Sequence, residues 1–101
     1  MSRVLLQFDF PYTGPWGPGM ASAMEGLAQD IAGEPGLVWK IWTESETEGR
    51  AGGIYLFETA AQAEAYRAKH SARLGAFGIT GIRAMAFDVN EALSRIDRAP
   101  L

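Results

Sequence analysis

Hydrophobic residues recur at every second position near the start of the chain, which predicts a β-strand over residues 4–10. One face of this strand is apolar and the other is mixed: Val4, Leu6, Phe8 and Phe10 against Leu5, Gln7 and Asp9. Pro11 ends the strand, and a loop rich in glycine and proline follows over residues 11–19. This loop holds Tyr12 and Trp16, two large aromatic residues that a solvated loop would not normally carry.

A helical period follows the loop and returns later in the chain. The first helix ends at Gly33 and Pro35, and its apolar stripe consists of Met20, Met24, Leu27, Ala28 and Ile31. Thr59 fits the N-cap of a second helix, which is closed by Gly75 and Gly78. The core-facing stripe predicted for this second helix consists of Ala63, Tyr66, His70, Leu74 and Phe77.

The stretch between the two helices predicts a β-hairpin with arms over residues 36–44 and 52–57. Both arms are rich in β-branched and aromatic residues, and the linker over residues 45–50 is polar and carries a glycine. Simple alternation divides the first arm into two faces: Leu37, Trp39, Ile41 and Thr43 against Val38, Lys40, Trp42 and Glu44. Trp39 and Trp42 therefore cannot both line one pocket on one face.

A fourth strand is predicted over residues 80–89, followed by a short helical pattern in the tail over residues 90–101. The resulting order, βαββαβ, predicts a single α+β domain over residues 1–101 with a ferredoxin-like arrangement. In that arrangement both helices lie on one face of a four-stranded antiparallel sheet. Because the strands carry apolar residues on both faces, the uncovered face predicts a homodimer that packs sheet against sheet. One hairpin tryptophan would then line a cavity and the other the interface.

Composition narrows the choice of partners. The chain has 101 residues, 48% of them hydrophobic and 21% charged, as is ordinary for a globular domain. A net charge of −3 argues against nucleic acid or an anionic membrane as partner. The chain has no cysteine, no apolar run near the roughly 20 residues of a membrane span and no apolar signal core at its start. We therefore expect a soluble cytoplasmic protein.

The hairpin and three other segments carry a family resemblance. In and around the hairpin the similar runs are EPGLVWKIWTE (residues 34–44) and AGGIYLF (residues 51–57). The other segments are KHSARL (residues 69–74), FDVNEALS (residues 87–94) and the proline-rich loop (residues 11–18). Together they resemble the YdhR family of putative mono-oxygenases over nearly the whole chain. The resemblance implies a dimeric α/β barrel, related in fold to cofactor-free quinone-forming mono-oxygenases and to haem-degrading enzymes.

His70 is the candidate catalytic residue, because it is the single histidine and lies on the inward stripe of the second helix. Histidine can exchange a proton near neutral pH and can also ligate haem iron. The alternative is a buried histidine with a purely structural hydrogen bond. Arg73, one turn further on, could bind a phenolate or carboxylate, although a helix-end charge is the simpler interpretation.

Aromatic side chains are the candidates for binding a flat substrate by stacking, or alternatively for filling the core or the interface. Together with Arg73 they form the predicted substrate-binding set: Trp16, Trp39, Trp42, Tyr55, Tyr66 and Phe77. Trp16 is expected to cover the pocket mouth as a lid or wall. Lys40 and Glu44 are expected to form cross-strand or cross-dimer ion pairs. One histidine and no cysteine make a histidine/cysteine metal site untenable, which leaves only a carboxylate site open, and we expect no metal and no cofactor.

Three functions follow in order of preference. The first, which rests on the family resemblance, is a cofactor-independent mono-oxygenase acting on a small aromatic substrate such as a phenol, in a pocket between sheet and helices. His70 would act as the base. The second is a haem-binding or haem-degrading protein with His70 as axial ligand. Relatives of that type carry an asparagine on the first strand, where this chain has only Gln7 and Asp9. The third is a non-enzymatic dimer that binds a small molecule.

Overall fold

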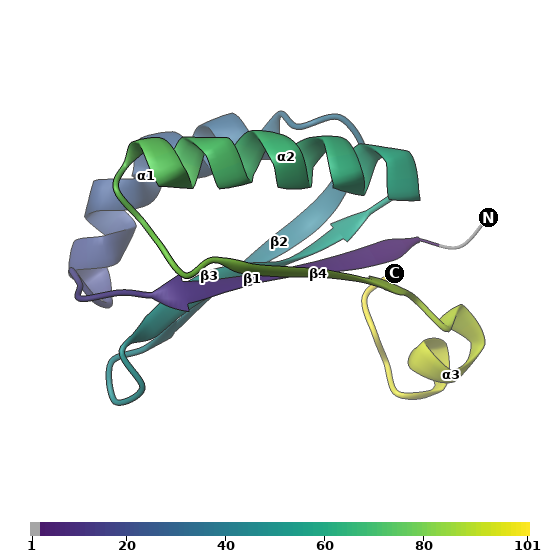
Figure 1. The fold of residues 1–101 in the computed structure, drawn as a ribbon. Helices are drawn as coiled ribbons and strands as arrows, with labels where there is room; N and C mark the ends of the chain where they lie inside the picture. Colours follow the sequence, from purple (N-terminus) through teal and green to yellow (C-terminus); the bar gives the residue numbers. More distant parts are fainter. Residues whose placement is uncertain (1–2) are drawn as a thin grey trace.

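The computed structural model describes residues 3–101, in which four strands and three helices follow one another (Figure 1). In chain order these elements are β1 (Val4–Pro11), α1 (Pro18–Ala32), β2 (Leu37–Ser45), β3 (Arg50–Phe57), α2 (Ala60–Ala76), β4 (Arg83–Asp88) and α3 (Glu91–Ile96). The predicted order is confirmed. The fourth strand is shorter than predicted: Gly81 has a positive φ of 69°, which a β-strand does not allow, and β4 begins two residues later.

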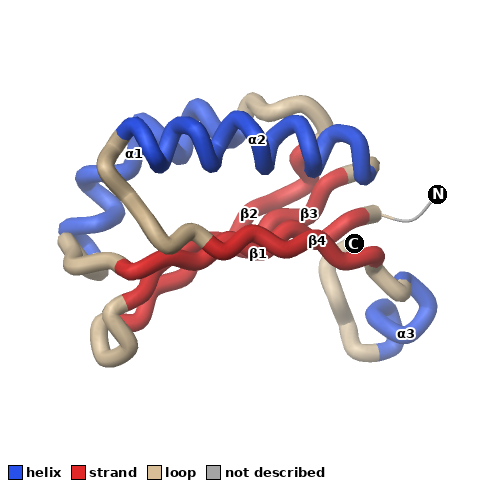
Figure 2. Tube along the Cα trace, in the orientation of Figure 1, coloured by secondary structure: helices blue, strands red, loops and turns tan. Residues whose placement is uncertain are grey.

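The four strands form one open antiparallel sheet in the order β2-β3-β1-β4, so that β1 and β3 lie in the middle. Helices α1 and α2 cover one face of the sheet, and the short helix α3 lies on the opposite side (Figures 1 and 2). This is the predicted α+β ferredoxin-like arrangement. None of the helices in residues 3–101 combines the length and the apolar character that crossing a membrane requires.

Helix α2 packs on the sheet through the predicted stripe, with one exception. Its N-cap is Thr59, whose hydroxyl accepts a hydrogen bond of 3.1 Å from the backbone N–H of Gln62. The first four residues of the stripe are buried: Ala63, Tyr66, His70 and Leu74. Phe77 is 66% exposed, because it is the C-cap residue and lies where the chain leaves the helix. The prediction that Phe77 belongs to the core is therefore wrong.

An irregularity at the start of β2 changes which side chains share a face. The pairing of β2 with β3 shifts between Leu37 and Trp39, so that Leu37 lies opposite Phe57 and Trp39 lies opposite Leu56. Leu37 packs on the core under the helices, whereas Trp39 lies on the other face. Simple alternation wrongly placed these two residues together. From Trp39 onward the alternation holds, and Lys40 and Trp42 face the helices.

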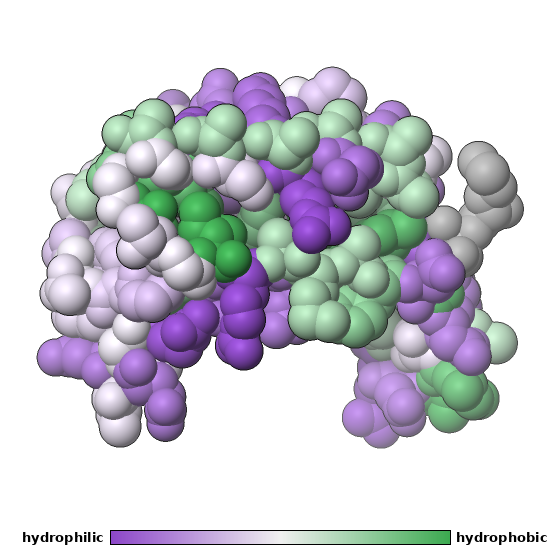
Figure 3. All heavy atoms as spheres, viewed as in Figure 1, coloured by the Kyte–Doolittle hydropathy of each residue, from purple (hydrophilic) through white to green (hydrophobic). Residues whose placement is uncertain are grey.

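The face of the sheet opposite α1 and α2 is partly covered by the chain's own tail, which the sequence did not predict. The indole N–H of Trp39 donates a hydrogen bond of 2.7 Å to the carbonyl oxygen of Pro100, and Leu56 beneath the tail is fully buried. The rest of this face lies open, and Ile41 and Met85 on it are 53% and 56% exposed. In the space-filling view this face forms the roof of a hollow that lies between the β2–β3 turn and α3 and opens downward (Figure 3).

Candidate functional site

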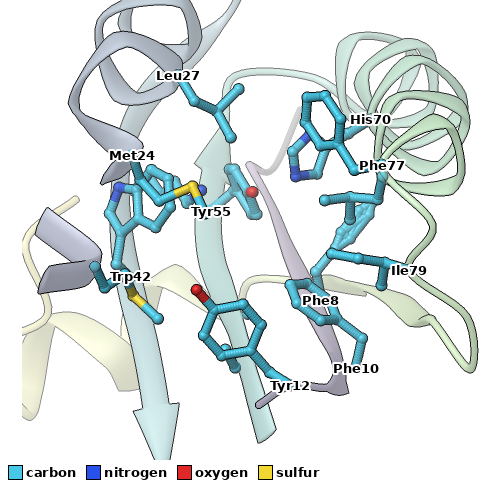
Figure 4. Close-up of a pocket in the computed structure, with 15 residues that line it drawn as sticks. Phe8, Phe10, Tyr12, Met24, Leu27, Trp42, Tyr55, His70, Phe77 and Ile79 are labelled. Carbon is cyan, nitrogen blue, oxygen red and sulfur yellow. The ribbon is translucent and has the colours of Figure 1, made fainter. Parts of the chain in front are cut away.

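A small cavity lies between the two long helices and the sheet, and side chains from nearly every element around it form its wall (Figure 4). Its volume is about 50 Å³. The wall is formed by Phe8, Phe10, Tyr12, Met20, Met24, Leu27, Lys40, Trp42, Ala51, Gly52, Tyr55, His70, Leu74, Phe77 and Ile79. Most of these side chains are apolar or aromatic, and only a few offer polar atoms, which is the usual composition of a small-molecule site.

An open cleft of about 370 Å³ adjoins this cavity on the side of α1 and β2. The cavity and the cleft share three wall residues, Met20, Met24 and Trp42. Methionine side chains are flexible and adapt their shape to a neighbour. Movement of the two methionines would therefore join the cavity to the cleft and admit a ligand larger than the cavity alone can hold.

His70 faces the cavity from α2 and is 3% exposed. Nη2 of Arg73 lies 3.0 Å from Nδ1 of His70, and because a guanidinium can only donate, Nδ1 accepts and carries no proton. Burial, with the nearby charges of Lys40 and Arg73, lowers the pKa of His70 from 6.5 to about 3. The imidazole is therefore neutral at pH 7, with its proton on Nε2. It can donate a hydrogen bond to a ligand, and the nitrogen that would act as a base is occupied.

Lys40 brings a positive charge to the same cavity from β2. Its Nζ lies 3.4 Å from the ring centroid of Trp42 and 4.7 Å from that of Tyr55. Burial, together with the positive charge of Arg73, lowers the pKa of Lys40 to about 7. None of the salt bridges within residues 3–101 includes Lys40, and Glu44 instead accepts the backbone N–H of Gly17 at 2.7 Å. The predicted cross-strand ion pair of Lys40 therefore does not form within residues 3–101, and the alternative, a pairing across the dimer, stays a prediction.

Tyr12 adds a third polar group to the cavity wall. Its hydroxyl is buried and has no hydrogen-bond partner among the described residues. Figure 4 shows this hydroxyl turned toward the interior of the cavity, on the side of Trp42 and Met24. Burial and the charge of Glu44 raise the pKa of Tyr12, so the hydroxyl stays protonated. A buried polar atom without a partner needs an explanation, and a ligand that hydrogen-bonds to it would be one.

The polar atoms of the cavity are held by a cluster of packed rings behind them. The hydroxyls of Tyr55 and Tyr66 share a hydrogen bond of 3.1 Å, and the Tyr66 ring stacks on His70 with centroids 5.0 Å apart. Phe8 contacts the same imidazole at a centroid distance of 5.2 Å. Burial raises the pKa of both tyrosines. The imidazole is thus fixed in orientation by the stacked ring of Tyr66, by the tilted ring of Phe8 and by Arg73.

The predicted site residues fall into two groups in the structure. Four of them form part of the cavity wall: His70, Trp42, Tyr55 and Phe77. Tyr66 and Arg73 lie behind His70, and the Arg73 guanidinium also donates to Asp30 at 2.7 Å. Trp16 and Trp39 are not part of the wall.

Trp16 and Trp39 instead occupy two other places. Trp16 packs edge-on against the ring of Tyr12, with centroids 5.1 Å apart, and so supports a wall residue from outside. Trp39 lies beneath the tail on the other face of the sheet. The alternation of the two hairpin tryptophans is therefore confirmed, with Trp42 as the one at the cavity.

Two functional candidates, Lys40 and Tyr12, were not predicted as site residues. The position of Lys40 was available in the sequence, since alternation places it on the same face as Trp42. Lys40 is a charged residue on the strand face that also carries Trp42, and this pattern could have indicated a polar group at the cavity. The sequence marks Tyr12 only as an aromatic residue in a loop, and no local pattern predicts that its hydroxyl lies in the cavity wall.

The site offers little to a large or metal-containing cofactor. Within residues 3–101, no group of three or more His, Cys, Asp or Glu side chains is placed to hold a metal ion. A haem could be ligated only through Nε2 of His70, since Nδ1 is occupied by Arg73. Pockets for drug-sized ligands measure about 300–1,000 Å³, so the inner cavity of about 50 Å³ holds no haem unless it joins the neighbouring cleft.

Comparison with known families supplies one match. The model of the family described as "Putative mono-oxygenase ydhR" matches residues 5–100. No curated protein sequence matches the chain. Because the match spans nearly the whole chain, the protein belongs to this family, as its hairpin and α2 segments indicated.

Proposed function

We propose that this member of the YdhR family is a cofactor-independent mono-oxygenase that oxidises a small phenol-like aromatic compound. The observation that carries the proposal is the aromatic cavity under α1 and α2, into which the polar groups of Tyr12, Lys40 and His70 converge. Rings line the space where a flat substrate would stack, and the polar groups would orient its oxygen. The family description supports oxygen chemistry and leaves the substrate open.

The reaction would take all its electrons from the substrate. Loss of the phenolic proton gives an anion that can transfer electrons to dioxygen directly. One oxygen atom becomes a new carbonyl at a ring carbon that loses its hydrogen, and the other leaves as water. The phenol thus becomes a quinone, and its four-electron oxidation balances the reduction of one O2.

The protein would contribute orientation, exclusion of water and electrostatic stabilisation. His70 would donate from Nε2 to the developing anion, in the manner of an oxyanion hole. Arg73 would act as a positioning residue, since it holds Nδ1 of His70 at 3.0 Å and does not line the cavity. His70 would not act as the base that the sequence suggested, because a histidine with a pKa of about 3 is a poor proton acceptor.

The substrate would enter from the open cleft beside α1. A benzene-sized ligand needs a cavity of about 150 Å³, more than the 50 Å³ of the inner space. The cleft of about 370 Å³ supplies the missing room once Met20 and Met24 move aside. The aromatic body would then lie near Trp42, with its hydroxyl directed into the inner cavity.

Oxygen uptake tests the proposal. The purified protein is mixed in air with a panel of hydroxyarenes that carry a single ring hydroxyl, without added reductant and with a metal chelator present. We expect protein-dependent uptake of one O2 for each quinone formed, with one atom of labelled dioxygen in the product. His70→Phe should lower kcat without abolishing binding. If no hydroxyarene gives uptake above that of heat-denatured protein, the proposed reaction is wrong, and saturable binding without uptake would favour a binding protein.

We further infer that the working unit is a homodimer, packed through the sheet face opposite α1 and α2 to form the α/β barrel of the family resemblance. The tail covers only the end of this face near Trp39, and the row Ile41, Ile54, Gln7 and Met85 crosses the open part. An exposed, largely apolar row in the middle of a sheet supports burial against a second copy. The hollow in Figure 3 gives that copy a place to sit.

A further inference from the structure

We propose that Lys40 is the general base of this site, and that the ligand is an ionisable phenol or enol whose anion pairs with the Lys40 ammonium group. This assignment rests on the function proposed above and gives it a substrate class. It differs from that function in one respect, since binding of the anion can be measured without any oxidation.

The position of Lys40 is built into the sheet. Its partner across the strands is Tyr55, and its stem runs over Gly53, the partner of Trp42. A Cβ atom on Gly53 would lie 2.6 Å from Cε of Lys40, so a larger residue there would displace the side chain. Lys40 is thereby held at the cavity, with its amine between two aromatic rings.

The charges around Lys40 explain why its amine is available. Tyr55 faces it from β3 as a neutral hydroxyl, and on β2 the carboxylate of Glu44 is engaged by the Gly17 N–H. From α2 come the neutral His70 and Tyr66 and the cation Arg73. Asp30 on α1 pairs with the Arg73 guanidinium at 2.7 Å, and Glu34, whose charge reaches Tyr66, pairs with Lys69. Among residues 3–101, Lys40 therefore has no counter-ion of its own, and an anionic ligand would supply one.

Two further donors converge on the same space. The buried hydroxyl of Tyr12 has no partner within residues 3–101. His70 is part of the cavity wall, and Nε2–H is the group that it can donate from, because Arg73 occupies Nδ1. Together with the Lys40 amine they form three donors around a space of about 50 Å³, enough for one oxygen and its immediate neighbours. Three donors and no carboxylate suit an oxyanion better than a neutral or cationic group.

The proton transfer is simple and balanced. The neutral amine of Lys40 takes the proton of the bound hydroxyl: the O–H bond breaks, its electron pair stays on oxygen, and an N–H bond forms. The resulting ammonium remains beside the oxyanion and stabilises it. Since Lys40 has a pKa of about 7, a large fraction of the empty protein holds the neutral amine at neutral pH.

4-Nitrophenol is a direct probe, because its phenolate absorbs visible light and it can be titrated while bound. We expect the wild-type protein to bind it saturably and to lower its apparent pKa by about one unit or more relative to the free compound. In Lys40→Met the bound probe should ionise at or above the pH of the free compound, since an apolar cavity disfavours an anion. Lys40→Arg, which keeps the charge, should retain the lowered pKa.

Arg67→Met is the matched control, because Arg67 lies on α2 with its side chain 42% exposed and is not part of the cavity wall. It should bind and ionise the probe as the wild type does. Circular dichroism and thermal unfolding establish that each variant is folded. Absence of saturable binding by the wild type, or a lowered probe pKa that survives in Lys40→Met, would overturn the assignment.

The same variants separate this inference from the proposed reaction. Binding and ionisation of the probe without oxygen uptake from any hydroxyarene would remove the mono-oxygenase and leave the anion site standing. Oxygen uptake that persists at the wild-type rate in Lys40→Met would exclude Lys40 as the base and leave the proposed mono-oxygenase reaction standing. Lys40→Arg should bind the anion yet lose turnover at neutral pH, because arginine cannot accept the proton.

Discussion

Arg73 donates a hydrogen bond from Nη2 to Nδ1 of His70 across 3.0 Å, so Arg73 orients an imidazole that lies one turn earlier in α2. The same guanidinium is anchored to Asp30 of α1 at 2.7 Å. The single histidine of the chain is therefore held from behind, and only its Nε2–H faces the cavity. This one contact decides that His70 serves as a hydrogen-bond donor.

The first prediction concerns the ionisation of His70. Because burial and the charges of Lys40 and Arg73 lower its pKa to about 3, the imidazole should stay neutral between pH 5 and 8. NMR of the ring protons reads this directly, since the chain has one histidine. Arg73→Met removes one of the charges and should raise the pKa of His70. A midpoint near 6.5 in the wild type would contradict the structure.

The second prediction is a pH dependence of stability. In the unfolded chain His70 binds a proton as the pH falls through 6.5, whereas in the folded chain it does so only near 3. Stability should therefore decrease as the pH falls below 6.5, by about 2 kcal/mol at pH 5 from this group. Urea unfolding at pH 7 and pH 5 measures the difference. His70→Phe should lose this part of the decrease, and equal decreases in both proteins would argue against it.

The third prediction is that Lys40→Met stabilises the protein. The pKa of Lys40 falls from 10.5 in the unfolded chain to about 7 in the folded one, so stability rises with pH between these values and is reduced at pH 7. Removing the charge should add about 1–2 kcal/mol at pH 7, after discounting for partial exposure and the lost cation–π contacts. Urea unfolding tests this, with Arg67→Met expected within about 0.5 kcal/mol of the wild type. A destabilised Lys40→Met would make Lys40 a structural residue.

The fourth prediction separates a binding hydroxyl from a structural one. Tyr12→Phe removes a buried hydroxyl that has no partner in the described part of the chain, so stability should stay unchanged or rise by up to about 1 kcal/mol. Binding of 4-nitrophenol should weaken about 10-fold, as loss of one hydrogen bond implies. Tyr66→Phe is the contrasting variant: it breaks the bond to Tyr55 and should cost about 1 kcal/mol of stability with little effect on binding. The opposite pattern would exclude Tyr12 from the site.

The fifth prediction concerns assembly. Sedimentation should give about twice the chain mass of 10.9 kDa for the wild type. Met85→Glu places a charge on the open sheet face and should yield the monomer. Ala68→Glu places the same charge on an exposed position of α2 and should remain dimeric. A monomeric wild type, or dissociation by the α2 change alone, would show that the sheet face is not the interface.

The order of elements, the capping of α2 by Thr59 and the inward position of His70 were determined by the sequence alone. The reason is that a period of two or of 3.6 residues, and a hydroxyl three residues before an N–H, are local properties of the chain. The opposite placement of Trp39 and Trp42 follows from the same local geometry. The irregularity after Leu37 does not affect this placement, because both tryptophans follow the irregularity in the chain.

Other features depend on the tertiary structure, because they arise from contacts between segments that are distant in the sequence. Phe77 lies on the helical stripe yet is exposed, because burial depends on what faces the helix end. The tail contacts Trp39 through Pro100, which lies 61 positions away in the sequence, and a periodic pattern of residues cannot predict a contact between such distant positions. The lowered pKa of Lys40 arises from burial between Trp42, Tyr55 and the helices, and desolvation is a property of the assembled cavity. A sequence pattern can place a side chain on a face, but the groups that surround it there depend on the packing of the other elements.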